Sequence, residues 1–207
     1  MLSSRKIKLQ SAPDDSILPR IGGTCLLPAA ITWPENPDGE KLTLAVFLPA
    51  TFLNDVLGLG YPEDHAISVF TTYNEQYFLD YIIYHGDPLD LKTIQMGFTQ
   101  VIVHPIAGPR SDGVSSIPAQ EIITGDVLES NEHYTGSKTG GMPGFLQHEN
   151  YALHHLMFGL QLYGGDYPEP FSNIFYLQDA VGYLFVKPYA DWMEQTTDAG
   201  LFFVQCT

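Results

Sequence analysis

The residues best suited by type to metal binding or catalysis are the histidines and the acid of HENYALHH, residues 148–155. Imidazole and carboxylate groups are ordinary zinc ligands, so the first candidates for a metal site are His148, Glu149, His154 and His155. Their spacing differs from the HExxH of zinc proteases, and the apolar residues that follow predict a strand. In a strand, His154 and His155 point to opposite faces and do not share one ion. We predict turn or surface histidines; the alternative is a metal-dependent enzyme or small-ligand site over 148–166.

No motif for nucleophilic or phosphate chemistry accompanies these histidines. The chain has no G-x-S-x-G turn, and the glycine pairs at 22–23, 140–141 and 164–165 lack the Lys-Ser/Thr of a phosphate-binding loop. Cys25 follows a glycine pair, with no evident positive neighbour that would lower its thiol pKa. Cys25 and Cys206 form no close-spaced metal or redox pair, so both are expected to be free thiols. The sequence predicts neither an enzyme nor a cofactor.

The charge of the chain is strongly negative: 24 Asp and Glu oppose nine Lys and Arg, for a formal net charge of -15. This sign repels phosphate backbones and anionic lipid, so binding to nucleic acid or to a membrane is not expected. It speeds the capture of a cationic partner, whereas the alternative is that the charge serves solubility alone. The opening MLSSRKIKLQSAPDD lacks the apolar stretch of a signal peptide, and no segment approaches about 18 consecutive apolar residues. A cytoplasmic protein is therefore expected.

Tyrosines are interspersed with acids between residues 61 and 90, and only Lys92 opposes them nearby. An aromatic ring beside a carboxylate is a favourable surface for the Arg and Lys side chains of a partner. The predicted partner-binding surface combines this segment with the loops 106–116 and 129–144. Its residues are Glu63, Asp64, Tyr73, Glu75, Asp87, Asp90, Asp112, Glu129 and Glu132. A solvated acidic face without a partner is the alternative.

Short apolar runs between Gly and Pro predict strands, and long amphipathic patterns are scarce. The expected strands are 42–48, 66–73, 76–84, 99–104, 117–128, 153–163, 171–178, 181–187 and 201–206, where 153–163 is one long strand or two strands around Gly159. Residues 50–57 have helical spacing that ends at Gly58, and 190–196 are expected to form a second short helix. Hairpin turns are expected at 74–75 and 179–180, and exposed loops at 106–116 and 129–144.

These elements predict an α+β fold: one β-rich domain over 1–207, with twisted, mainly antiparallel sheets and a few short helices. An irregular N-terminal arm over 1–40 is expected to pack on it. Trp33 and Trp192 are expected to pack in the core, because tryptophan is costly to expose. One internal echo is consistent with duplication, and a chance match of two glycines is the alternative: RIGG at 20–23 and KTGG at 138–141 each precede an irregular stretch and then a strand.

Four patterns, in this order, resemble the YwqG-like family, a bacterial domain of unknown function. They are RIGGTCLLPAAITWPENPDGEKLTLAVFL at 20–48, TGGMPGFLQ at 139–147, LMFGLQL with Gln161, and VGYLFVKPYADW…GLFFVQC at 181–206. The segment between them, 50–135, matches poorly. The family commonly has a Gln just after the first strand, where this chain has Phe47-Leu48-Pro49. It also has Trp-Gly-Asp where this chain has Leu177-Gln178-Asp179, so a site that uses those polar positions is altered here.

The resemblance implies an α+β fold with pseudo-repeated sheets and brings no established reaction. Relatives beside bacterial toxin genes imply an immunity role for some members of the family. Combined with the acidic charge, this gives the hypothesis of an immunity protein that binds and neutralises a basic toxin acting in the cytoplasm. A nuclease encoded nearby fits that description, because a cleft that binds nucleic acid is basic.

Overall fold

The computed structural model describes residues 3–73, 79–112, 114, 116–129, 133–147, 153, 155–188 and 198–207. Within them, ten strands form one antiparallel sheet in the order β10-β9-β8-β7-β1-β6-β2-β3-β4-β5. They are β1 (Arg5–Ser11), β2 (Arg20–Ile21), β3 (Thr43–Pro49), β4 (His65–Thr71), β5 (Thr99–Pro105), β6 (Gln120–Val127), β7 (Lys138–Thr139), β8 (Met157–Tyr163), β9 (Val181–Val186) and β10 (Gly200–Gln205). The expected β-rich α+β fold with mainly antiparallel pairing is confirmed.

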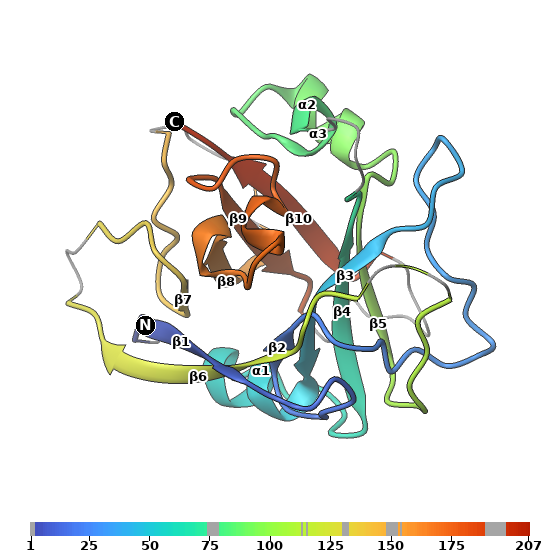
Figure 1. The fold of residues 1–207 in the computed structure, drawn as a ribbon. Helices are drawn as coiled ribbons and strands as arrows, with labels where there is room; N and C mark the ends of the chain where they lie inside the picture. Colours follow the sequence, from blue (N-terminus) through green and yellow to red (C-terminus); the bar gives the residue numbers. More distant parts are fainter. Residues whose placement is uncertain are drawn as a thin grey trace.

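The sheet curls until its two end strands meet (Figure 1). The Thr99 hydroxyl in β5 donates to the Phe202 carbonyl in β10 at 2.7 Å. Just before β10, the Ala199 N–H donates to the Val101 carbonyl at 2.9 Å. An open sheet edge is a template for unwanted pairing, so these contacts between the end strands protect both edges.

The strand order consists of two equivalent halves. One half contains β6-β2-β3-β4-β5, the other contains β1-β7-β8-β9-β10, and β1 and β6 pair at the centre. Along the chain the strands run β1–β5 and then β6–β10. The first strand of each run lies in the other half of the sheet, because β1 pairs with β7 and β6 pairs with β2. The strand order therefore repeats in the two halves, and the exchange of first strands ties the halves together.

The RIGG and KTGG echo marks the same turn in each half. The glycines that follow β2 and β7 all have φ between 60° and 75°, a region that side chains disfavour: Gly22, Gly23, Gly140 and Gly141. The Gly22 N–H donates to the Ala45 carbonyl at 3.0 Å, and the Gly140 N–H donates to the Gly159 carbonyl at 3.3 Å. Ala45 and Gly159 lie at the register shifts of β3 and β8, so the two halves share one register.

The main core lies inside the curled sheet, between inward side chains of both halves such as Val46, Val69, Leu160 and Leu184. After β3, helix α1 (Ala50–Leu57) packs Leu53 and Leu57 onto this core and ends at Gly58, which has φ 66°. The helix and its stop are as predicted. After β8, the corresponding connection contains the short helices η1 (Gly164–Asp166) and η2 (Phe171–Asn173).

Two tyrosines join the halves reciprocally. Tyr61, between α1 and β4, donates its hydroxyl to the Lys187 carbonyl just beyond β9, at 2.6 Å. Tyr176, between η2 and β9, donates to the Thr72 carbonyl just beyond β4, at 2.9 Å. Because β4 and β9 hold corresponding places in the sheet, each hydroxyl meets the same carbonyl position of the opposite half.

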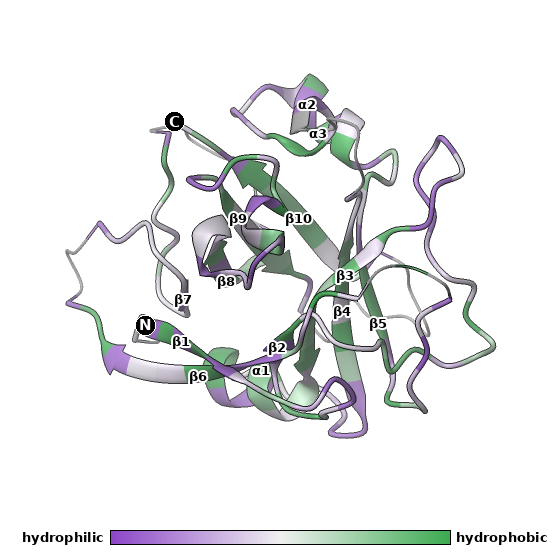
Figure 2. Ribbon diagram, in the orientation of Figure 1, coloured by the Kyte–Doolittle hydropathy of each residue, from purple (hydrophilic) through white to green (hydrophobic). Residues whose placement is uncertain are grey.

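Irregular segments cover the outer face of each half. In the first half, Trp33 packs on Phe70 with ring centroids 5.4 Å apart and donates its indole N–H to the Leu42 carbonyl at 2.9 Å. In the second half, Phe145 and Leu153 pack against the aromatic residues of β9 and β10. The packing predicted for Trp33 is confirmed, and Trp192 lies outside the described residues. Figure 2 shows the apolar strands β4, β9 and β10 flanked by more hydrophilic connections.

The strand predicted over 76–84 is wrong where it is described. Residues Leu79–Ile82 form helix α2, and a second helix, α3 (Pro88–Ile94), follows. The run is apolar on both sides because it packs in two directions: Tyr81 stacks on Phe98 at 4.3 Å, whereas the Tyr84 N–H donates to the Val204 carbonyl in β10 at 3.1 Å. Residues 74–78, with the expected turn, lie outside the described part.

Three further predictions need correction. Residues 171–178 form η2 and turns instead of a strand, because the adjacent Ile174 and Phe175 are both buried and Tyr176 has φ 69°. The arm over 1–40 is not irregular throughout, since β1 and β2 belong to the centre of the sheet. The loop at 129–144 contains the buried strand β7. The helix expected at 190–196 lies outside the described residues, and no helix within them has the length and apolar character to cross a membrane.

Candidate partner-binding surface

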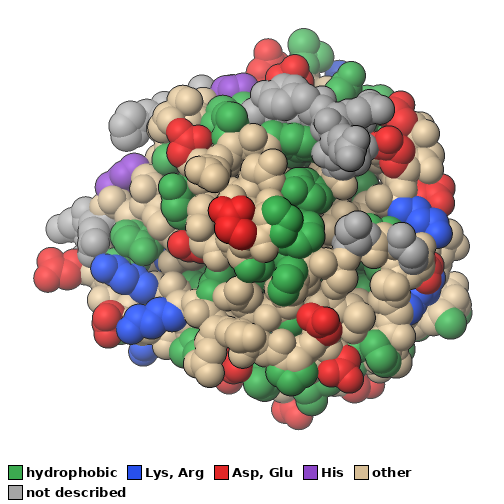
Figure 3. Space-filling model, viewed as in Figure 1, with side chains coloured by type: hydrophobic (Ala, Val, Ile, Leu, Met, Phe, Trp, Pro, Cys, Tyr) green, Lys and Arg blue, Asp and Glu red, His purple; other side chains and the backbone are tan. Residues whose placement is uncertain are grey.

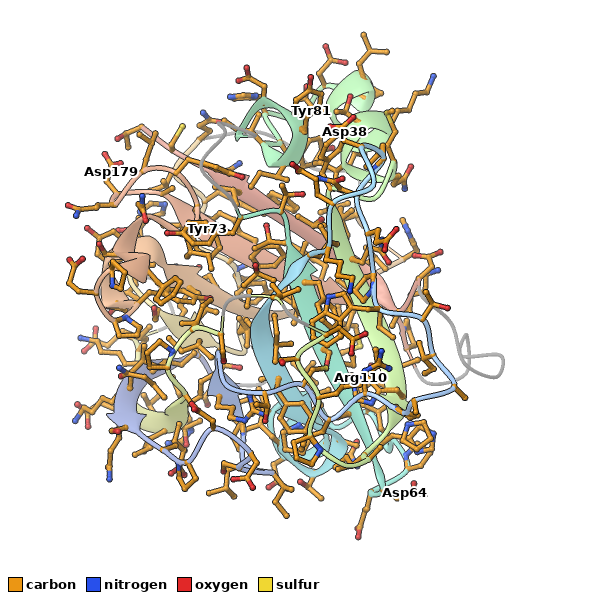
Figure 4. The ribbon with its side chains drawn as sticks, turned by 45° about the vertical axis from the view of Figure 1, so that its right-hand side comes forward. Asp38, Asp64, Tyr73, Tyr81, Arg110 and Asp179 are labelled. Atoms are coloured by element: carbon orange, nitrogen blue, oxygen red, sulfur yellow. The ribbon has the colours of Figure 1, made fainter. Side chains whose placement is uncertain are left out.

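The first predicted residues, Glu63 and Asp64, are exposed in the turn between α1 and β4. Asp64 Oδ1 lies 2.8 Å from His65 Nδ1, and this hydrogen bond lowers the pKa of Asp64. Figure 4 shows Asp64 at one end of the ribbon and Tyr81 of α2 at the other. The two acids are accessible to a partner, but they lie far from the acids of α3 described next.

Asp87 and Asp90 have local roles at α3. Asp87 caps the helix, since its Oδ1 accepts the Leu89 N–H at 2.8 Å and Pro88 fills the first helical position. Asp90 accepts the His85 N–H at 3.0 Å and lies 3.5 Å from His85 Nδ1. Both acids shape the α2–α3 end of the molecule.

Asp112 serves an internal contact. The Arg110 guanidinium donates to both of its carboxylate oxygens, through Nε at 3.1 Å and through Nη2, and this pairing lowers the pKa of Asp112. Arg110 also stacks on Trp33 at 5.5 Å and donates to the Pro28 and Ile31 carbonyls at 3.0 and 2.9 Å. The pair therefore fastens the segment that covers the first half.

Glu129 is exposed beyond β6. Its neighbour Leu128 donates its N–H to the Ser4 carbonyl near the start of β1. Glu75 and Glu132 lie outside the described residues. The predicted residues that the structure describes thus occupy several sides of the molecule and do not form one surface.

Tyr73, in contrast, lies where aromatic and acidic groups do gather. Its half-buried ring follows β4 and lies 5.7 Å from the ring of Phe171 in η2. Its hydroxyl donates to the side-chain oxygen of Asn173 at 2.8 Å. Burial and the nearby carboxylate of Glu169 raise the pKa of Tyr73. We refer to Tyr73, Glu169, Phe171, Asn173 and Tyr176 as the Tyr73 face.

Hydrogen bonds hold the Tyr73 face in one arrangement. The Ser172 hydroxyl donates to Glu169 Oε1 at 3.0 Å, and Tyr176 is held by its bond to Thr72. Burial raises the pKa of Tyr176, and Glu40 adds to this effect, so Glu40 belongs to the same side of the molecule. Figure 3 shows acidic and hydrophobic side chains next to one another over η1 and η2.

Few positive side chains are exposed near the Tyr73 face, because most are buried, paired with an acid or located on β1. Arg20 and Lys138 are buried, at 0% and 3% exposure, and two further cations form the ion pairs Arg110–Asp112 and Lys187–Asp198. Three of the others share one strand, β1: Arg5, Lys6 and Lys8. No carboxylate in the described ranges is buried. Arg20 and Lys138 therefore add little positive surface, and the exposed charge of the described residues is predominantly negative.

A serine, a histidine and a cysteine meet beneath the segment that covers the first half. His104 Nδ1 donates to the Pro105 carbonyl at 2.8 Å, so Nε2 accepts from the Ser68 hydroxyl, also at 2.8 Å. Cys25 Sγ lies 3.8 Å from Ser68 Oγ. None of the three is more than 1% exposed, so no substrate reaches them. Burial lowers the pKa of His104 and raises the pKa of Cys25, as expected for packed, unreactive groups.

The metal alternative finds no ligand set in the part of the chain that the structure describes. No three His, Cys, Asp or Glu converge there. Of the four candidates only His155 is described, and it is exposed; the other three are His148, Glu149 and His154. A recess of about 420 Å³ opens where β5 meets β10, beside Gln100 and Asp198. Residues 189–197, which precede Asp198, lie outside the described ranges, so we assign this recess no ligand.

The strand predicted over 171–178 misses the roles of Phe171 and Tyr176, and no pattern in the sequence selects Glu169. The signal that indicates a role for this connection is the RIGG and KTGG echo. It aligns the connection from β3 to β4 with the connection from β8 to β9, so the second connection, like α1, is expected to reach the opposite half. The same alignment places Gln161 in β8 where Phe47 stands in β3, since both pair with the basic residue of the echo.

No protein-family model matches the chain, and a search of curated proteins finds no match. The resemblance to the YwqG-like family therefore stays a prediction that depends on the four motifs quoted above.

Proposed function

We propose that this protein binds a basic protein partner, and that it is an immunity protein for a basic toxin acting in the cytoplasm. The observation that carries the proposal is the sorting of charge. Seven of the nine cations are buried, paired or collected on β1, Lys41 and Lys92 being exposed elsewhere, whereas the described carboxylates all reach the surface. A field of one sign attracts an oppositely charged partner and raises its rate of association.

A nuclease is the class of toxin that this surface fits best. An active cleft that holds a phosphate backbone must be rich in Lys and Arg. An acidic surface with aromatic anchors is complementary to such a cleft, because carboxylates replace the phosphates and rings supply buried contact area. The Tyr73 face offers both kinds of group in a fixed arrangement.

The experiment is a co-expression assay with the basic product of the adjacent gene, followed by pull-down from the same cells. The wild-type chain is expected to restore growth and to retain the partner. Charge reversal by Glu40→Lys and Glu169→Lys is expected to abolish both effects. Asp55→Lys with Asp126→Lys, at two exposed acids on α1 and β6 outside the Tyr73 face, changes the net charge by the same amount and is the matched control, which is expected to retain the partner. Retention of the partner by the reversed variant, or no retention by the wild type, contradicts the proposal.

A further inference from the structure

Within the Tyr73 face, the rings of Tyr73 and Phe171 lie close to the carboxylate of Glu169. The rings of Tyr73 and Phe171 are tilted by 52°, so neither covers the other completely. Glu169 stands two positions before Phe171, and its Oε1 accepts the Ser172 hydroxyl, which leaves Oε2 for other donors. Both rings are half-buried and Glu169 is exposed, so all three groups are reachable from solvent.

The chain itself contains a filled example of this chemistry. Arg110 lays its guanidinium on the Trp33 ring at 5.5 Å while it donates to both carboxylate oxygens of Asp112. A guanidinium is planar and weakly hydrated, so it stacks on a ring and forks onto a carboxylate at the same time. The Tyr73 face has the ring and the carboxylate of this arrangement.

None of the chain's own arginines reaches the Tyr73 face. The three are all described and all held elsewhere: Arg5 donates to the Gly125 carbonyl at 3.4 Å, Arg20 is buried against Phe47, and Arg110 lies on Trp33. We propose that the Tyr73 face takes the guanidinium of an arginine presented by the basic partner. This inference rests on the proposed function and narrows it to an arginine-bearing segment of a protein.

The test compares fluorescein-labelled polyarginine and polylysine peptides of equal length and charge. Fluorescence anisotropy with the full chain is expected to give about three- to fivefold tighter binding of polyarginine, because an ammonium stacks and forks less well. Phe171→Ala is expected to remove this preference. Tyr73→Phe keeps the ring, and it is expected to retain most of the preference.

Two further variants make the test robust. Glu169→Gln is isosteric and exposed, so it is expected to fold normally and to weaken polyarginine binding about threefold more than polylysine binding. Asp64→Asn, at the other end of the molecule, removes one charge and is expected to weaken both peptides equally. Circular dichroism shows which variants are folded.

The outcomes separate this inference from the proposed function. Equal binding of both peptides, or a preference that survives Phe171→Ala and Glu169→Gln, overturns the arginine site and leaves a charge-driven immunity protein in place. No binding of either peptide also overturns it. Failure of the adjacent gene product to bind, with the arginine preference intact, instead contradicts the immunity role alone.

Discussion

Both halves of the sheet hold a covering segment with buried polar side chains, but the residue types differ between the halves. Each half carries an irregular segment over its outer face, and the buried backbone groups of that segment need hydrogen-bond partners. In the first half, the buried Arg20 donates to the carbonyls of Ser16, Gly22 and Thr24. Burial lowers the pKa of Arg20 to about 10, so it stays charged at neutral pH.

The second half uses neutral amides and a phenol for the same task. Gln161 donates to the carbonyls of Tyr134 and Gly136 at 2.9 and 2.8 Å and accepts the Gly144 N–H at 2.7 Å. Tyr183 donates to the Gly144 carbonyl at 3.0 Å, and Gln205 accepts the Leu146 N–H at 3.1 Å.

By register, Gln205 corresponds to His104 of the first half. The comparison indicates that Arg20 in the first half, and Gln161, Tyr183 and Gln205 in the second, fasten the covering segments.

Replacing Arg20 is expected to have the largest effect on stability. Arg20→Met leaves three carbonyls without their donor and is expected to lower the free energy of unfolding by about 3 kcal/mol or more. Urea denaturation measures the loss. Lys8→Met, an exposed substitution on β1, is the control and is expected to cost less than about 0.5 kcal/mol. Equal losses for the two variants would show that Arg20 does not fasten the segment.

Gln161→Leu tests the second half at the corresponding place. Two carbonyls and one N–H lose their partner, so a loss of about 2 kcal/mol is expected. Hydrogen exchange of the Gly144 amide is expected to accelerate well beyond that of the amides in β4. An unchanged Gly144 exchange rate contradicts the role given to this side chain.

Tyr61→Phe and Tyr176→Phe test whether the two reciprocal hydroxyl contacts stabilise the halves equally. Each variant removes one hydrogen bond between the halves and is expected to cost about 1 kcal/mol in thermal or urea unfolding. The two losses should be similar and nearly additive in the double variant, since the two hydrogen bonds share no partner. A large loss for one tyrosine and none for the other would refute the symmetry of these contacts.

The smallest effect at neutral pH concerns His104, which the second half replaces with Gln205. Burial lowers the pKa of His104 in the folded state, so below about pH 6.5 the unfolded chain gains the proton first. The contribution of His104 to the free energy of unfolding is therefore expected to be constant above that pH and to fall as the pH decreases below it. His104→Gln should reduce this slope, as measured by urea unfolding between about pH 7 and about pH 5. An identical slope in wild type and variant argues against a buried neutral His104.

Local patterns predicted much of the fold. The strands β3, β4, β5, β9 and β10 and the helix that ends at Gly58 follow from apolar runs bounded by Gly and Pro. The predictions failed at 76–84 and 171–178, where strand-like composition packs in two directions over the ends of the sheet. Tertiary contacts decide such segments, so composition alone misassigns them.

The candidate site was less accessible to sequence reasoning. Tyr73 was selected from acids near it in the chain, yet its structural neighbours, Glu169 and Phe171, come from the other half. Asp87 and Asp112 were selected for their charge, but a helix cap and an internal ion pair use them. Only the RIGG and KTGG echo contains information about which distant segments meet.

The decisive measurement is the salt dependence of binding between this protein and the proposed partner, a basic toxin encoded beside its gene. Association and dissociation rates are measured by surface plasmon resonance over a range of NaCl concentrations. We expect the association rate to fall steeply with added salt, as electrostatic steering requires, and Glu40→Lys with Glu169→Lys to slow it further. An association rate that is independent of salt and of these charges, or an absence of binding at the lowest salt, would contradict the account.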